Sequence, residues 1–313
     1  MAHHHDHDHC SGHHHHAPVN NSRIFGFIIV LNLIFIGIEL AYGFIAHSTA
    51  LLADAGHNVS DVLGLLMAWA ALALANKKPS KRYTYGLRSS TILAALANSM
   101  LLLVACGAIG LEAVQRLSQP HPVAGLTVSV VAGAGLLTNG LSALILMRGN
   151  KNDINVRGAF LHMAADAAVS LAVVIAGVAM LYTDWYWLDP LISLVIVLVI
   201  LIGTWGLLRE ALRLALSAVP TKIDSTAIDN YLRQLDGVNE IHDLHIWGLS
   251  TTENALTVHL VMPNGHPGDD FMDDITATLK HHYDVHHSTL QIELGTTQHA
   301  CSLAVSEPTK HRH

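Results

Sequence analysis

Charged residues are scarce in this sequence, at 13%, and so are cysteines, of which there are three. Cys10, Cys106 and Cys301 lie far apart and form no disulfide framework, which excludes the small disulfide-stabilised folds of secreted proteins and indicates a reducing compartment for both tails. The first twenty residues show neither the basic start nor the apolar stretch of a cleavable signal peptide. The net charge of -7 gives no reason to expect a nucleic acid as partner.

Apolar residues are abundant instead. They make up 51% of the chain, which indicates an integral membrane protein embedded in a lipid bilayer. Six apolar stretches are each about long enough to cross the hydrocarbon core, which takes roughly 20 helical residues. We therefore predict a transmembrane domain over residues 23–208, with helices near 24–46, 50–75, 91–114, 123–147, 159–182 and 188–208.

The positive charges of the loops predict how these helices are oriented. Ten Lys and Arg residues precede residue 209, and nine of them lie beside the N-terminal arm or in the loops at 76–90 and 148–157. Only Arg116 lies on the opposite side. By the positive-inside rule, both termini are cytoplasmic.

A small soluble domain is predicted at residues 209–295, where the hydropathy falls. The pattern indicates the order helix, strand, strand, helix, strand, which is typical of an open α+β sandwich with helices on one sheet face. We expect helices at 224–235 and 269–282, and strands at 240–248, 255–262 and 285–294. Asp224 or Ser225 caps the first helix, and Leu294 faces the core. Residues 296–313 lack periodicity and are predicted to form a flexible tail.

Two of the apolar segments contain the same pair of ionisable residues. His57 and Asp61 are four residues apart, and His162 and Asp166 repeat that spacing. Residues at this spacing share one helix face, and a charge at the bilayer centre costs roughly 2.5–3.5 kcal/mol unless it faces a polar interior. If the second and fifth helices pack together, two imidazoles and two carboxylates supply the four ligands of a tetrahedral zinc site. In the alternative interpretation, each polar residue only hydrogen-bonds a neighbouring helix.

The ligand types indicate which ion such a site takes. Imidazole suits zinc, cadmium, cobalt and nickel, whereas magnesium, calcium and manganese prefer sites made of oxygen ligands. Zinc is the first choice because it accepts a tetrahedron of two nitrogens and two oxygens. Metal binding needs neutral imidazole and ionised carboxylate, so protons and metal compete for the same groups. That competition is a physical basis for exchanging protons for metal.

Two further carboxyl groups in the membrane segments, Asp54 and Glu39, can each be interpreted in two ways. Asp54 either accepts a hydrogen bond that orients a metal-binding imidazole, or caps the start of the second helix. Glu39 either lies on the ion pathway or is a buried hydrogen-bond partner.

Histidine is the outstanding excess, with 24 residues, nine of which lie in the first 22 positions. A purification tag is usually uninterrupted, whereas this tract is broken by Asp6, Asp8 and Cys10. We interpret residues 1–22 as a disordered cytoplasmic arm that collects metal. Its candidate ligands are His3, His4, His5, His7, His9, Cys10, His13, His14, His15 and His16.

The soluble domain is also rich in potential metal ligands. Three histidines fall on predicted strands and four surround the last join between helix and strand: His242, His245, His259, His281, His282, His286 and His287. Together with Asp243 and Glu293 they argue for further metal sites. Alternation along the last strand places His287 and Glu293 on one face, but leaves open whether His286 or His287 is the ligand.

Six stretches of this sequence resemble the cation diffusion facilitator family, in particular its bacterial branch of cobalt-zinc-cadmium efflux proteins and zinc transporters. They are LLADAGHNVSD at 51–61, RYTYGLRSSTILAAL at 82–96, HMAAD at 162–166, HDLHIW at 242–247, VHL at 258–260 and STLQIE at 288–293. The resemblance spans residues 23–293, and the paired HxxxD motifs are its most specific part.

This resemblance implies a homodimer of six-helix protomers joined through ferredoxin-like cytoplasmic domains, and proton-coupled zinc export. It implies His57, Asp61, His162 and Asp166 as the transport site. It implies cytoplasmic metal sites around His242, His259, Glu293 and either His286 or His287. Some relatives bind metal in the loop between the second and third helices, but residues 76–90 contain no histidine, aspartate, glutamate or cysteine, so no site is expected there. Other relatives have aspartate where His57 stands, and that version takes a broader range of metals.

We therefore expect an inner-membrane transporter, not an enzyme, that exports zinc and also cadmium or cobalt against inward proton flow, without an organic cofactor. The alternative is a membrane metal sensor that signals without transport, which leaves four ligands at membrane depth unexplained. An intramembrane zinc hydrolase needs an open coordination position and a general base. Here four protein ligands fill the coordination positions, and the sequence shows no separate nucleophile constellation.

Overall fold

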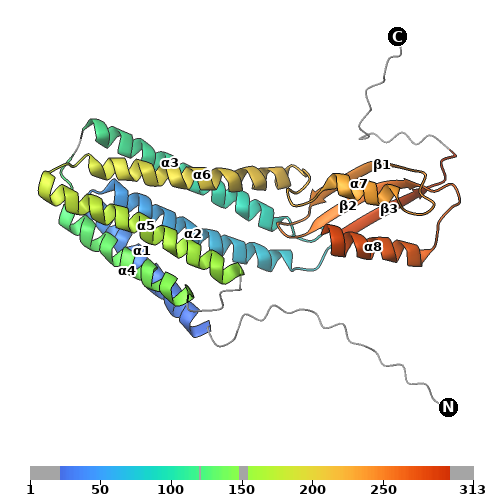
Figure 1. Ribbon diagram of the computed structural model, residues 1–313, viewed down its shortest axis with the longest axis horizontal. Helices are drawn as coiled ribbons and strands as arrows, with labels where there is room; N and C mark the ends of the chain where they lie inside the picture. The colour runs from blue at the N-terminus through green and yellow to red at the C-terminus, as the bar shows by residue number, and fades with distance from the viewer. Residues whose placement is uncertain (1–21, 120, 148–153, 297–313) are drawn as a thin grey trace, which may run out of the picture. The chain divides into compact units, whose positions relative to one another are not determined.

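A computed structural model describes residues 22–119, 121–147 and 154–296 of the chain (Figure 1). The ligands predicted in the N-terminal arm and residues 297–313 of the predicted tail lie outside the described residues. The chain divides into two compact units. The first unit consists of Met1–Ala55 and Glu112–Ile196, and the second of Gly56–Leu111 and Val197–His313.

Six long helices come first along the chain, as the hydropathy predicts. They are α1 (Ser22–Ile45), α2 (Thr49–Ala75), α3 (Ser90–Ser118), α4 (Gly125–Met147), α5 (Ile154–Thr183) and α6 (Leu188–Ala215). By length and composition, α2 to α6 are each able to cross a membrane, and α1 contributes an apolar stretch, Leu33–Ile45, among the described side chains. Helix α6 runs beyond the predicted end at residue 208 to Ala215, so its last turns include Arg209 and Glu210.

In the first unit, α5 packs along α4, and α1 packs against α4. A glycine lets the backbones of α4 and α5 come close together. A β-carbon at Gly177 would lie 3.0 Å from the backbone nitrogen of Ser129 and 3.1 Å from the carbonyl oxygen of Gly125. Lipid tails are as apolar as leucine, so close backbone contact, rather than a hydrophobic driving force, stabilises such a helix pair.

The start of α2 is held by side chains from within the first unit. Asp189, which is fully buried at the start of α6, accepts hydrogen bonds from the backbone amide and hydroxyl of Thr49 at 2.7 and 2.8 Å. The Ser48 hydroxyl also donates to Asp189 and accepts from the amide of Leu51 at 3.1 Å. Ser48 and Asp189 thereby satisfy amide groups that the first turn of a helix leaves without an intrahelical partner.

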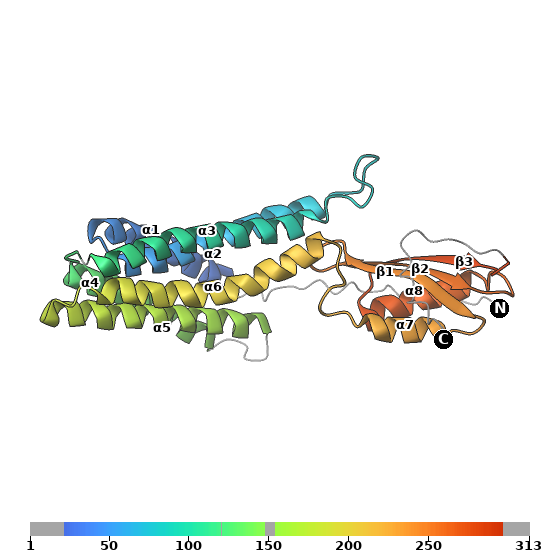
Figure 2. The same ribbon diagram turned by 90° about the horizontal axis from the view of Figure 1, so that it is seen from above.

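The second unit contains the small α+β domain, and the expected order of helix, strand, strand, helix, strand is confirmed. Its elements are α7 (Ser225–Arg233), β1 (Glu240–Gly248), β2 (Asn254–Val261), α8 (Asp269–Tyr283) and β3 (His287–Glu293). The sheet order is β1-β2-β3, with β2 antiparallel to β1 and parallel to β3. Figure 2 shows α7 and α8 on the same side of this sheet, which leaves its other face uncovered by either helix.

The core of this domain lies between the sheet and its two helices. Ile228 of α7 and Ile275 of α8 pack in one cluster with Leu256, Val258 and Leu260, which alternate along β2. This alternation sends the intervening Thr257 and His259 to the opposite face. The core thus determines which side chains of β2 are left on the uncovered face.

Local signals at the ends of these elements agree with most of the predictions. The Asp224 carboxylate caps α7 by accepting from the amides of Thr226 and Ala227, at 2.9 and 3.0 Å. The last strand needs correction, because it begins at His287 instead of residue 285 and ends at Glu293. Leu294, which was predicted to face the core, is 52% exposed, since the chain leaves the sheet there and turns at Gly295 with a φ of 71°.

Within the second unit, the start of α3 contacts the turn between β1 and β2. Arg88 forms an ion pair with Glu253, and the hydroxyl of Ser89 donates to the carbonyl of Leu249 at 3.3 Å. The amide of Thr251 donates to the hydroxyl of Thr91 at 3.1 Å. Both charged and neutral hydrogen bonds therefore join this helix end to the turn.

Candidate functional site

The two HxxxD pairs lie on helices, as their spacing predicts. On α2, the Nε2 atom of His57 is 3.6 Å from an Oδ2 atom of Asp61, and the two side chains are 25% and 32% exposed. Neither residue is fully buried, and both lie on a helix of membrane length. A histidine and a carboxylate on one helix face supply half of a tetrahedral metal site.

The second pair lies on α5. Asp166 is 4% exposed, and the side chain of His162 lies outside the described residues. Helix α5 belongs to the first unit, whereas His57 and Asp61 belong to the second. The formation of one four-ligand site by both pairs therefore stays a prediction.

The two further carboxyl groups of the membrane helices are deeply buried in the first unit. Asp54 is 1% exposed and accepts a hydrogen bond from the hydroxyl of Ser170 at 3.2 Å. Asp54 lies in the second turn of α2 and therefore does not cap this helix. Ser48 holds the cap position, where its hydroxyl accepts from the amide of Leu51. Glu39 is completely buried on α1.

A cluster of metal-ligating side chains lies on the uncovered face of the sheet. Within the described part of the chain, His242, His259 and Glu293 each offer one ligand atom, and these atoms lie within 4.8 Å of one another. His242 and His259 are directly opposite each other in the β1–β2 pairing, and Glu293 ends β3 beside Val261. Three strands thus contribute one ligand each.

The distances in this cluster fit a metal ion with nitrogen and oxygen ligands. The Nδ1 atom of His259 is 2.8 Å from Oε1 of Glu293, and Nε2 of His242 is 3.4 Å from Oε2 of the same carboxylate. The Nε2 atom of His242 is buried and makes no hydrogen bond to any described residue. Zn²⁺ suits two imidazoles and a carboxylate, and a fourth position remains for water or another ligand.

The two histidines at the start of the last strand, His286 and His287, make contacts outside this cluster. The Nδ1 atom of His286 is 3.4 Å from the amide of Asn254, and its Nε2 atom is 3.7 Å from Asp284. The ring of His287 packs edge-on against Tyr85, with 5.6 Å between centroids. The structure therefore brings His242, His259 and Glu293 together, and places His286 and His287 in other contacts.

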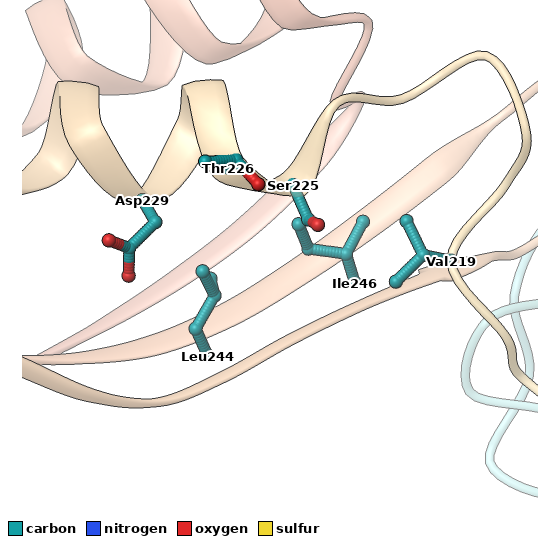
Figure 3. A pocket seen from close by; sticks show the side chains of 6 residues that line it. All are labelled: Val219, Ser225, Thr226, Asp229, Leu244 and Ile246. Carbon is teal, nitrogen blue, oxygen red and sulfur yellow. The ribbon is translucent and has the colours of Figure 1, made fainter.

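A hollow beside the start of α7 was not expected from the sequence, and Figure 3 shows its lining. It is lined by Val219, Ser225, Thr226, Asp229, Leu244 and Ile246. Its one carboxylate, Asp229, already accepts a hydrogen bond from Arg233 at 2.7 Å. The hollow thus offers two hydroxyl groups and apolar walls, which is not the ligand set of a metal site.

Helices of membrane length followed by a small α+β domain with a two-histidine, one-glutamate cluster define a membrane protein that handles divalent metal ions. The chain belongs to the cation efflux family, also called the cation diffusion facilitators. Its residues 27–214 match the cation efflux transmembrane domain, and residues 220–294 match the cytoplasmic domain of cation efflux proteins. The resemblance inferred from the sequence motifs is thereby confirmed, and the protein is a multi-pass membrane protein.

Relatives of the same length share about a third of their residues with this chain. The zinc transporter ZitB of Escherichia coli is 33% identical over 92% of this chain and 92% of its own length. The metal cation efflux system protein CzcD of Cupriavidus metallidurans is 33% identical over 93% of this chain and 92% of its own. A cadmium, cobalt and zinc/H(+)-K(+) antiporter of Bacillus velezensis is 31% identical over 96% of this chain and 99% of its own.

Proposed function

We propose that this protein exports Zn²⁺ from the cytoplasm across the inner membrane in exchange for protons, and that it also accepts Cd²⁺ or Co²⁺. The observation that carries this proposal is the His57–Asp61 contact of 3.6 Å on a membrane-length helix of a cation efflux protein. The names of the relatives support the choice of ions, since they include a zinc transporter and a cadmium, cobalt and zinc antiporter.

In this proposal, His57 and Asp61 of α2 bind the ion together with His162 and Asp166 of α5. Each of the four groups binds metal only in its deprotonated form, so a proton that arrives from the outer side competes directly with the ion. Binding from the cytoplasm takes place on neutral imidazoles, and protonation at the outer side releases the metal. Asp54 and Glu39, both deeply buried on membrane helices, are the candidate residues of the proton pathway.

The orientation follows from charge. Nine of the ten Lys and Arg residues before residue 209 lie on one side of the predicted spans, so both termini and the α+β domain are cytoplasmic. The N-terminal histidines then meet the ion on the side from which it is exported, as expected of a metal-collecting arm.

The cytoplasmic domain has two roles in this proposal. His242, His259 and Glu293 bind Zn²⁺ as a regulatory or structural ion, which is supported by the buried Nε2 atom of His242. The domain also joins two protomers into a homodimer. The sheet face uncovered by α7 and α8 supports this second role, because it leaves room for another chain.

The test is zinc flux into proteoliposomes that hold the intact protein, with an imposed pH gradient and a fluorescent zinc reporter inside. We expect Asp166→Ala to abolish the flux, and Asp184→Asn to leave it unchanged, because Asp184 is exposed and accepts a hydrogen bond from Tyr186. Equal flux in Asp166→Ala and the parent would show that the site is misplaced.

The same vesicles separate the remaining interpretations. Zinc flux that neither needs nor dissipates the pH gradient would refute proton exchange. If the parent shows no flux but still binds Zn²⁺, the protein is a metal sensor and not a transporter.

A further inference from the structure

Strand β1 contains one more residue than its partner at the metal cluster. His242 pairs with His259, and His245 pairs with Thr257, so three steps along β1 correspond to two along β2. The extra residue is Asp243, whose φ of 52° lies in the left-handed region. Such a bulge shifts the alternation of a strand and redirects a side chain. Here His242 and His245 both reach the uncovered face although they are three residues apart.

The bulge places the carboxylate of Asp243 between two imidazoles. Its Oδ1 atom is 3.0 Å from Nε2 of His245, and its Oδ2 atom is 3.8 Å from Nε2 of His259. The Asp243 side chain is 19% exposed and that of His259 is 18% exposed, so water screens this contact only in part. Asp243 is thus fixed by His245 on one side and faces a member of the metal cluster on the other.

The two ring nitrogens of His259 face different carboxylates. Nδ1 is 2.8 Å from Glu293, which is the side of the metal cluster, and Nε2 is on the side of Asp243. A metal-binding imidazole carries its proton on the nitrogen that does not bind the ion, and an acceptor for that proton fixes the tautomer and the ring orientation. Asp243 is the carboxylate on that side.

We propose that Asp243 is a positioning residue for the cytoplasmic zinc site. It accepts a hydrogen bond from the Nε2–H of His259, so that the Nδ1 lone pair is held toward the ion shared with His242 and Glu293. His245 in turn holds Asp243 through its own Nε2–H. This inference rests on the proposed binding of Zn²⁺ to the cytoplasmic domain. In the sequence pattern HDLH at 242–245, His242 is then the ligand, and Asp243 and His245 are the supporting residues.

A merely structural role of Asp243 makes a different prediction. Aspartate, asparagine and glycine all tolerate a left-handed φ, so Asp243→Asn and Asp243→Gly both keep the bulge. If the bulge alone matters, both variants bind metal like the parent. If the carboxylate positions His259, affinity falls in order from parent to asparagine, which is a neutral acceptor, to glycine, which has no acceptor.

The experiment uses full-length protein in detergent titrated with Co²⁺, whose visible absorption reports tetrahedral sites. The component of the spectrum that His242→Ala removes belongs to the cytoplasmic site. We expect Asp243→Gly to weaken Co²⁺ binding to this component about 10- to 100-fold, the usual effect of losing such a supporting group, and Asp243→Asn to weaken it less. The thermal unfolding temperature of the metal-free protein should stay at that of the parent in both variants.

A spectroscopic signal separates positioning from folding. In the Co²⁺ protein, the Nε2–H proton of His259 gives a shifted NMR resonance, which should exchange slowly with solvent in the parent and rapidly in Asp243→Gly. Unchanged affinity and exchange in that variant would overturn the role of Asp243 alone. If His242→Ala removes no component, the cytoplasmic zinc site itself is wrong. Should Asp243→Gly fail to fold, Asp243→Asn decides by the same two measurements.

Discussion

The carboxylate of Asp189 on α6 accepts a hydrogen bond from the backbone amide of Thr49 at 2.7 Å, so one helix of the first unit caps another. Both residues are fully buried. A buried donor that loses its acceptor costs about 1–3 kcal/mol, and Asp189 serves the amide and hydroxyl of Thr49 as well as the hydroxyl of Ser48.

Asp189→Ala should therefore lower the unfolding temperature of the detergent-solubilised protein, followed by tryptophan fluorescence. The matched control is Asp184→Asn, which changes an exposed carboxylate only a few residues away and should have little effect. Equal unfolding temperatures for Asp189→Ala and the parent would contradict the capping role.

The ion pair between Arg88 and Glu253 predicts a second measurable coupling. The two side chains are 38% and 34% exposed, so solvent screening limits the pair to about 0.2–1 kcal/mol. Arg88→Glu places like charges together and should speed hydrogen exchange at the amides of residues 249–254, and Glu253→Arg should do the same. The double variant restores opposite charges and should return exchange toward that of the parent, as a double-mutant cycle requires. Additive effects in the double variant would show that the pair does not hold the turn.

Replacing His57 tests what determines the choice of metal. His57→Asp exchanges an imidazole for a carboxylate, and an oxygen-rich site suits Mn²⁺ better than a site with two imidazoles. We expect the ratio of Mn²⁺ to Zn²⁺ flux in proteoliposomes to rise. His121→Asp, the same substitution at an exposed loop position, is the control and should leave the ratio unchanged. A ratio that stays the same in His57→Asp would remove His57 from the transport site.

Two glycines of the first unit predict opposite effects of the same substitution. Gly177→Ala places a β-carbon 3.0 Å from a backbone nitrogen of α4, and overpacking of this kind costs about 1–3 kcal/mol. At Gly140 on α4 a β-carbon would meet no atom of the described residues within 4 Å, and alanine favours the helix by about 1 kcal/mol over glycine. The unfolding temperature should fall for Gly177→Ala and stay level or rise for Gly140→Ala. A fall in both would mean that backbone contact between α4 and α5 is not the cause.

Local patterns in the sequence were sufficient to predict the elements of the protein. Hydropathy predicts the long helices, and the alternation of Leu256, Val258 and Leu260 predicts a strand with one buried face. Asp224 is recognisable as a cap because its amide partners lie two and three residues away. The contact of His57 with Asp61 is likewise local, because helix geometry alone sets the distance between residues four apart.

Contacts between distant parts of the chain could not be predicted in this way. Nothing near Thr49 indicates that its amide is capped by a residue 140 positions away. The cluster of His242, His259 and Glu293 depends on the pairing of three strands. The sequence alone therefore could not decide whether His286 or His287 is a metal ligand. One signal for the bulge was present: Ile241 and Leu244 are both apolar and three apart, which breaks the alternation of a regular strand.

Strand β3 lies at an edge of the sheet, where β2 is its strand partner among the described residues, and it supplies Glu293 at its end. An ion bound by His242, His259 and Glu293 would link β3 to the other two strands. Metal binding and the attachment of β3 to the sheet are then thermodynamically coupled. At a free Zn²⁺ concentration roughly 100 times the dissociation constant, the ion adds about 2.7 kcal/mol to the free energy that keeps β3 in place. If the proposed site binds Zn²⁺, the free zinc concentration around this domain therefore sets how often β3 detaches from the sheet.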